Sequence, residues 1–200
     1  MKFISTLIAV ATLATAGASF AADRQLHLRG EVTAASAGEL TIVDRKGVKT
    51  TVQLPEKAQV LDVSRSSPAA IQENSYLGIA AAPGPDGKIQ ATGVMIFPEA
   101  ARGMNEGHYP WDNIEQGTMT NATVAKVVKK SSSTELEMRF GGRTQQVMLD
   151  KATIYGQFVP GERKLLVAGA KVMVIGAEGA DGKVHANAVL VGRDGFMPPL

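Results

Sequence analysis

The chain has 200 residues and contains no cysteine. Disulfide bonds and a cysteine nucleophile are therefore excluded, and the fold must be held together by ordinary apolar burial. A hydrophobic content of 44% is sufficient for such a core. Aromatic residues are also few, and the chain has a single tryptophan, Trp111.

Long apolar runs are missing from most of the chain, and no later stretch approaches the ~20 apolar residues that a membrane-spanning helix requires. The one apolar run lies at the start, where Lys2 precedes Phe3 to Ala16. Small residues then flank Phe20 at the two positions that a signal peptidase reads. Residues 1–21 are therefore predicted to be a signal peptide, cleaved after about Ala21. The remaining chain is expected in the periplasm, without a membrane span.

Charge of one sign is not in excess either, because the formal net charge is +2. Such a balance provides no general attraction to nucleic acid or anionic lipid, so nucleic acid is not an expected partner. The chain lacks a Gly-x-Ser-x-Gly sequence, a glycine-rich phosphate loop and a His-x-His or Glu-x-x-His spacing. The sequence therefore predicts no catalytic residues and no cofactor beyond a divalent metal as an alternative.

Two segments of the chain are similar to each other. The segment from Gly30 to Pro98 and the segment from Ala122 to Gly192 align at an offset of about 92–96 residues. Both contain apolar residues that alternate with polar ones, as in Glu135 to Phe140, and this period of two is typical of half-buried strands. Turn residues at Arg45-Lys46-Gly47 and at Gly141-Gly142 predict hairpins at matching places.

About five short strands per segment, with little helix, predict an all-β protein of two tandem small OB-like or SH3-like barrels from an internal duplication, joined by an irregular connector. Whether the two copies share one core is left open. The predicted divisions are a signal peptide at 1–21, a first barrel at 25–98, a connector at 99–118, a second barrel at 119–193 and an extended tail at 194–200.

The connector is not repeated, and it gathers the side chains that are most suited to binding. Trp111 and Tyr109 offer aromatic faces on which a sugar or another flat ligand stacks, and Arg102 adds a cation. The alternative is a rigid connector in which Trp111 fills a gap between the two barrels. The remaining histidines, His27 and His185, are expected on solvated strand faces.

A divalent metal site is a further alternative for the connector. Glu106, His108 and Asp112 supply two carboxylates and one imidazole, which hard and borderline metal ions accept as ligands. Their spacing matches no established metal motif, so the metal hypothesis depends on the residue types alone.

The pattern as a whole resembles a family of exported bacterial proteins built on a domain of unknown function with OB-like barrels. Its most specific elements here are Phe97-Pro98-Glu99-Ala100, Arg102-Gly103, Glu106-Gly107-His108, Pro110-Trp111-Asp112, Thr118 to Thr123 and Val191 to Gly195. Members often carry the automatic label "metal ABC transporter permease". A permease needs several membrane spans, which this sequence lacks, so the resemblance implies at most a soluble accessory in metal handling.

These observations together predict an exported, non-catalytic periplasmic binding or envelope-associated protein of unknown ligand. The expected partner is a small molecule, a glycan or an envelope protein, and the oligomeric state is open. The alternatives are a soluble periplasmic metal-binding accessory protein and, third, an enzyme whose site the sequence does not reveal.

Overall fold

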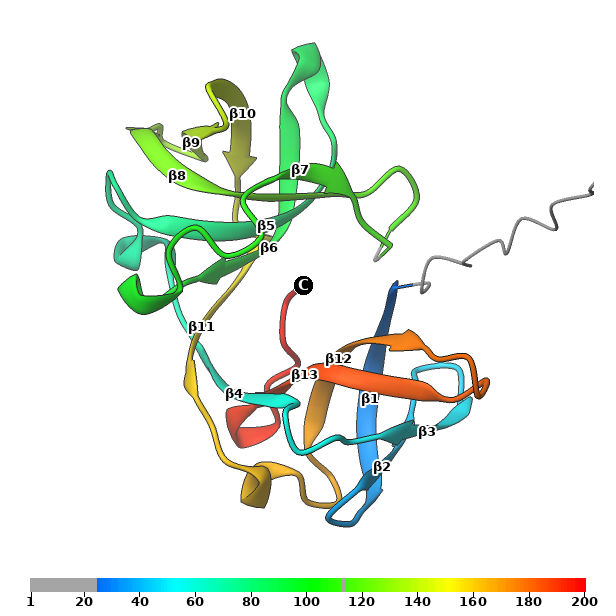
Figure 1. The fold of residues 1–200 in the computed structure, drawn as a ribbon. Coiled ribbons are helices and arrows are strands. Elements are labelled where there is room, and N and C mark those ends of the chain that lie inside the picture. The colour runs from blue at the N-terminus through cyan, green and yellow to red at the C-terminus, as the bar shows by residue number, and fades with distance from the viewer. Residues whose placement is uncertain (1–24, 113) are drawn as a thin grey trace, which may run out of the picture.

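The computed structural model describes residues 25–112 and 114–200, and the predicted signal peptide lies outside them. The described chain is all-β, and its strands join in one sheet (Figure 1). The strands are β1 (Gln25–Ala35), β2 (Glu39–Val43), β3 (Lys49–Gln53), β4 (Gln59–Arg65), β5 (Tyr76–Pro83), β6 (Ile89–Ile96), β7 (Gly107–Pro110), β8 (Thr118–Lys129), β9 (Thr134–Phe140), β10 (Arg143–Leu149), β11 (Ile154–Pro160), β12 (Lys171–Glu178) and β13 (Val184–Gly192).

Short 3₁₀ turns interrupt the connections between the strands. They span Pro68–Ala70, Pro85–Gly87, Glu99–Ala101, Arg163–Leu165 and Arg193–Gly195. None of the described helices is long and apolar enough to cross a membrane.

The pairings close two five-stranded rings. In the first ring, β1 pairs with β2 and β12, β2 pairs with β3, and β13 closes the circle by pairing with both β3 and β12. In the second ring, β8 pairs with β5 and β9, β9 pairs with β10, and β6 closes the circle by pairing with both β10 and β5. Figure 1 shows the two rings as separate groups, with β4 and β11 running between them.

This pairing corrects the expected tandem division. Residues 25–98 do not close on themselves, because β5 and β6 leave the first ring and complete the second. In the same way, β12 and β13 come from the second half of the chain and complete the first ring. Local hairpin patterns specify neighbouring strands, whereas the partner of a parallel pairing such as β3–β13 is decided by long-range burial.

The two rings have matching registers. Val52 of β3 pairs with Val184 of β13. The residue 95 positions after Val52 is Val147 of β10, and the residue 95 positions before Val184 is Ile89 of β6. These two residues also pair. The contact between β4 and β11 pairs Val63 with Phe158, two positions related by the same offset. The fold is therefore approximately two-fold about this β4–β11 contact.

Three apolar clusters form the core. The first lies among the strands of the first ring and the second among those of the second ring, and each alternates inward apolar residues as expected, with Leu136 and Met138 fully buried. The third cluster combines residues from both rings with Trp111, Phe196 and Leu200. The two rings thus bury apolar surface against each other instead of folding as isolated barrels.

Two further expectations are corrected. Each half has six strands, not about five, because β4 and β11 are strands of their own. The connector is also not wholly irregular, since Gly107–Pro110 forms β7 and pairs antiparallel with β8. Its glycine and proline content obscured a short strand whose partner lies just beyond it in the chain. The hairpins predicted at Arg45–Gly47 and Gly141–Gly142 are confirmed.

Candidate functional site

A charged network lies where β1 meets the end of the connector. His27 and Arg29 are two residues apart on β1, and alternation places both on the same face. The His27 ring Nδ1 lies 2.9 Å from Asp112 Oδ2, and Arg29 Nη2 donates to Asp112 Oδ1 at 3.0 Å. Asp112 therefore connects the connector to two side chains of β1.

Trp111 covers this network from the core side. Its ring centroid lies 3.9 Å from that of His27, at an interplanar angle of 37°. The His27 side chain is only 9% exposed, so the expectation of a solvated histidine is wrong for this residue. The His185 side chain contacts Asp181 at 3.1 Å and is 40% exposed, so it is more accessible than that of His27. His27 is less exposed than expected because Trp111 packs against it in the tertiary structure. The sequence around β1 contains no pattern that predicts this contact.

His27 and Trp111 each present a buried polar atom without a partner. Within the described residues, neither Nε2 of His27 nor Nε1 of Trp111 has a hydrogen-bond partner. Buried polar groups of this kind are rare and call for an explanation, such as water or a ligand atom. A catalytic His–Asp pair would need a nucleophilic hydroxyl at Nε2. Among the described residues no hydroxyl bonds Nε2, and the pair ties β1 to the end of the connector.

A groove of about 670 Å³ runs beside β1 and includes this network in its wall. Its apolar wall is formed by Leu28, Ile42, Val48, Ile114, Ile154 and the segment 197–200. Its polar wall is formed by His27, Arg29, Asp44, Arg45, Lys46, Thr50, Thr92 and Asp112. The groove thus joins an apolar surface to the turn of the β2–β3 hairpin.

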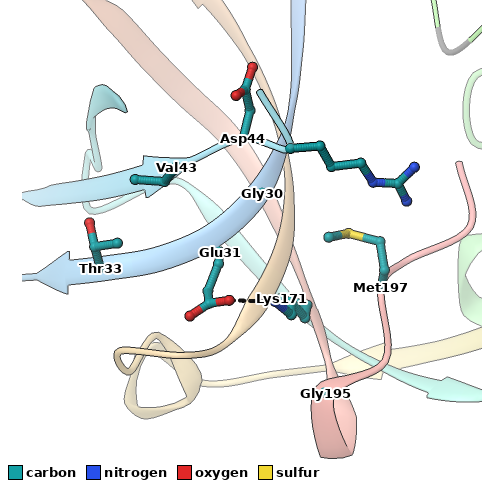
Figure 2. A pocket seen from close by; sticks show the side chains of 9 residues that line it. Gly30, Glu31, Thr33, Val43, Asp44, Lys171, Gly195 and Met197 are labelled. Carbon is teal, nitrogen blue, oxygen red and sulfur yellow. Dashed lines mark hydrogen bonds and ion pairs between the residues drawn. The ribbon is translucent and has the colours of Figure 1, made fainter. Parts of the chain in front are cut away.

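Figure 2 shows a smaller pocket of about 460 Å³ that adjoins the groove and shares Asp44, Arg45 and Met197 with it. Glu31 and Lys171 form an ion pair across this pocket. Because these two charges satisfy each other, the pocket offers a ligand less unpaired charge than the groove does.

The segment 197–200 forms one side of the groove and is held in place closely. Arg29 Nε donates to the Leu200 carbonyl oxygen at 2.6 Å. Gly93 allows the segment to approach, because a Cβ at that position would lie 1.8 Å from the Pro199 carbonyl oxygen. Leu200 is buried in the third apolar cluster. The predicted extended tail is therefore a packed part of the interface between the rings.

Of the predicted ligand residues, Tyr109 and Trp111 contact each other, whereas Arg102 forms its contacts with other residues. Trp111 is 9% exposed, so its face is not available as a platform for stacking. Tyr109 meets Trp111 edge-on at 6.3 Å, accepts a hydrogen bond from Asn121 Nδ2 at 2.9 Å, and has its pKa raised by burial. Arg102 instead donates to both carboxylate oxygens of Glu99, which raises the pKa of the guanidinium.

The predicted metal ligands do not converge. Glu106 Oε1 accepts from the Gly141 amide at 2.9 Å, whereas His108 Nδ1 lies 2.8 Å from Thr120 Oγ1. Asp112 is bound to β1, away from both. Partial burial lowers the pKa of His108. No group of three or more histidine or acidic side chains within the part of the chain described here is arranged to hold a metal ion.

The sequence alone missed the β1 side of the site. The spacing His27-x-Arg29 signals a shared strand face, and Arg45-Lys46 signals two adjacent cations at a turn, but neither reveals that they border one groove. Comparison with family models, with curated proteins and with solved structures finds no match to this chain.

Proposed function

We propose that this chain is an exported, non-catalytic binding protein and that its ligand occupies the groove along β1. The observation that carries the proposal is the combination of an apolar wall with two cations, Arg45 and Lys46, at one end. Ligand sites are typically concave and mostly apolar, with a few polar groups that orient the ligand.

The charges of the groove favour a negatively charged ligand. Asp44 Oδ1 accepts hydrogen bonds from the amides of Lys46 and Val48, so this carboxylate is occupied by its own turn. Asp112 is occupied by His27 and Arg29. Arg45 and Lys46 form no ion pair with any described residue and remain available to a ligand. We therefore expect a molecule with an apolar body and at least one acidic group.

The same proposal includes export to the periplasm and an origin of the two rings by internal duplication. The apolar N-terminal run with Lys2 before it supports export to the periplasm. The resemblance to exported proteins with OB-like barrels supports a role in the cell envelope, and the matched registers of the two rings support an internal duplication. No observation on the described residues favours the metal-binding alternative over a groove ligand.

The dye 8-anilinonaphthalene-1-sulfonate provides a direct test, because it combines aromatic rings with one negative charge. We expect the folded protein to bind one dye molecule with increased fluorescence. Replacing Arg45 and Lys46 together by glutamate should weaken binding by about tenfold, because the charge at the groove end is reversed.

A control is Lys57→Glu, which reverses the charge of another exposed residue outside the groove. This variant should bind the dye as the wild type does. Absence of binding to the folded wild type, or equal binding by all three proteins, would remove the groove as the ligand site.

A further inference from the structure

The outer edge of β8 carries an additional strand. Residues 118–121 of β8 pair with β5 on one side and with β7 on the other. The Trp111 amide donates to the Gly117 carbonyl at 2.8 Å, so these two residues form a hydrogen-bonded pair. In an antiparallel ladder every second pair is hydrogen-bonded. Tyr109 therefore exchanges backbone hydrogen bonds with Met119, and Gly107 does so with Asn121. These backbone groups of β8 are fully used.

No strand of the described residues covers the corresponding edge of β1. Gly78 of β5 and Met173 of β12 are related by the same offset of 95 residues. Gly78 pairs with Asn121, and Met173 pairs with Arg29, so residues 26–29 of β1 correspond to residues 118–121 of β8. In the described part of the chain, residues 26–29 pair with β12 alone, because the pairing with β2 begins only at Glu31. One edge of this stretch is therefore free of a ladder partner.

The backbone groups at this edge point outward. The Val32 amide donates to the Ala170 carbonyl at 2.9 Å, which sets the alternation along the β1–β12 pair. Leu28 consequently faces β12, whereas the amide and carbonyl of His27 and of Arg29 face the open side. Among the described residues, the His27 carbonyl accepts one long bond of 3.3 Å from Arg29 Nη1 on that side.

The groove beside β1 lies at the position that corresponds to the one that β7 occupies beside β8. In the second ring, β7 and its preceding residue contact the β9–β10 hairpin, with Glu106 bonded to the Gly141 amide and His108 stacked on Phe140 at 6.1 Å. The corresponding hairpin of the first ring joins β2 to β3, and its turn lines the groove. A strand in the groove would therefore touch the same elements that β7 touches.

We propose that the groove receives an extended acidic peptide segment of a partner protein, which adds as a strand antiparallel to residues 26–29 of β1. Strand addition to a free sheet edge is an established mode of peptide recognition. The inference rests on the proposed function, because it names the ligand class of the same groove. Arg45 and Lys46, which have no ion pair among the described residues, select for acidic side chains.

A second copy of this chain fits the groove less well. Pairing β1 with β1 would bring the Arg29 of the other copy into a groove that already contains Arg45 and Lys46. Like charges brought together in an interface oppose association. An acidic peptide instead neutralises these cations.

The probe is a synthetic peptide with the sequence of residues 105–112, Asn-Glu-Gly-His-Tyr-Pro-Trp-Asp, blocked at both ends. It contains the β7 strand and two acidic residues. Titrated into the full chain labelled with ¹⁵N, it should shift the amide signals of His27 and Arg29 and slow their hydrogen exchange. Methylation of the tyrosine nitrogen should weaken binding by about tenfold, because this removes one donor to the strand edge.

Arg45→Glu should weaken peptide binding by a similar factor, and Lys57→Glu should leave it unchanged. Equal binding of the methylated peptide, no binding of either peptide, or shifts confined to Met119 and Asn121 would each overturn the inference. Slowed exchange of the β1 amides that depends on protein concentration alone would also overturn it, in favour of a second copy. If the dye binds in the groove and the peptide does not, the strand inference fails and the proposed function stands.

Discussion

The edge of β8 and the edge of β1 occupy corresponding places in the two rings, and they are used differently. On β8, the connector folds back as β7 and pairs with residues 118–121. On β1, residues 26–29 border a groove and have no second ladder partner in the described chain. Within the described residues, one scaffold thus presents one edge covered by an added strand and one edge without such a strand, and we propose that the uncovered edge receives the strand of a partner.

The side chains at the two edges fit this difference. Asn121 on β8 donates to the Tyr109 hydroxyl and, at 3.2 Å, to the Asn105 carbonyl, so it fastens the added strand internally. The corresponding residue on β1 is Arg29, which bonds Asp112 and Leu200 and lies at the groove wall. An amide suits a buried internal contact, whereas a guanidinium retains its charge at a surface that faces solvent.

The largest effect on both edges is expected at Trp111, because its ring contacts Tyr109 of β7 and His27 of β1. Trp111→Ala should lower the free energy of unfolding by about 3–5 kcal/mol, because a large buried side chain leaves a cavity between the rings. Denaturant unfolding followed by circular dichroism measures this. Met104→Ala, at an exposed methionine, is the control and should cost less than about 0.5 kcal/mol. A small loss for Trp111→Ala would mean that the connector does not brace the rings.

A sharper test replaces the two corresponding residues one at a time. Asn121→Ala should lower the free energy of unfolding by about 1–3 kcal/mol, because the buried Asn121 side chain donates two hydrogen bonds to the β7 segment that the variant loses. Arg29→Ala should cost less than about 1 kcal/mol, because its ion pair with Asp112 is partly exposed. The same unfolding experiment compares both variants. Equal losses would show that the β1 edge is as much a structural element as the β8 edge.

The smallest expected effect concerns pH and the β7 side. Partial burial lowers the pKa of His108 below its ordinary value, so the unfolded chain binds this proton more readily than the folded chain does. The contribution of neutral His108 to stability is therefore present above about pH 6.5 and lost as the pH falls through the folded pKa. His108→Gln should reduce the decrease in unfolding free energy between pH 7 and pH 5. An unchanged or steeper decrease would contradict this assignment.

Local patterns predicted the strands well and their partners poorly. The alternation from Glu135 to Phe140 and the turn at Gly141-Gly142 were confirmed as β9 and its hairpin, because a hairpin depends on residues that are close in sequence. The sequence also indicated Asp112 and Trp111 as residues of interest. It did not connect them with His27, because a contact across 85 residues leaves no local signature.

The sequence by itself determined that this chain is free of disulfides and predicted that it is rich in strands, since composition and periodicity depend only on local chemistry. The tertiary structure decided which half completes which ring, where Trp111 is buried, and which of two corresponding strand edges stays open. These choices depend on the burial of apolar surface between segments distant in the chain, and on the inserted strand β7, which covers β8 while no described strand covers the corresponding edge of β1.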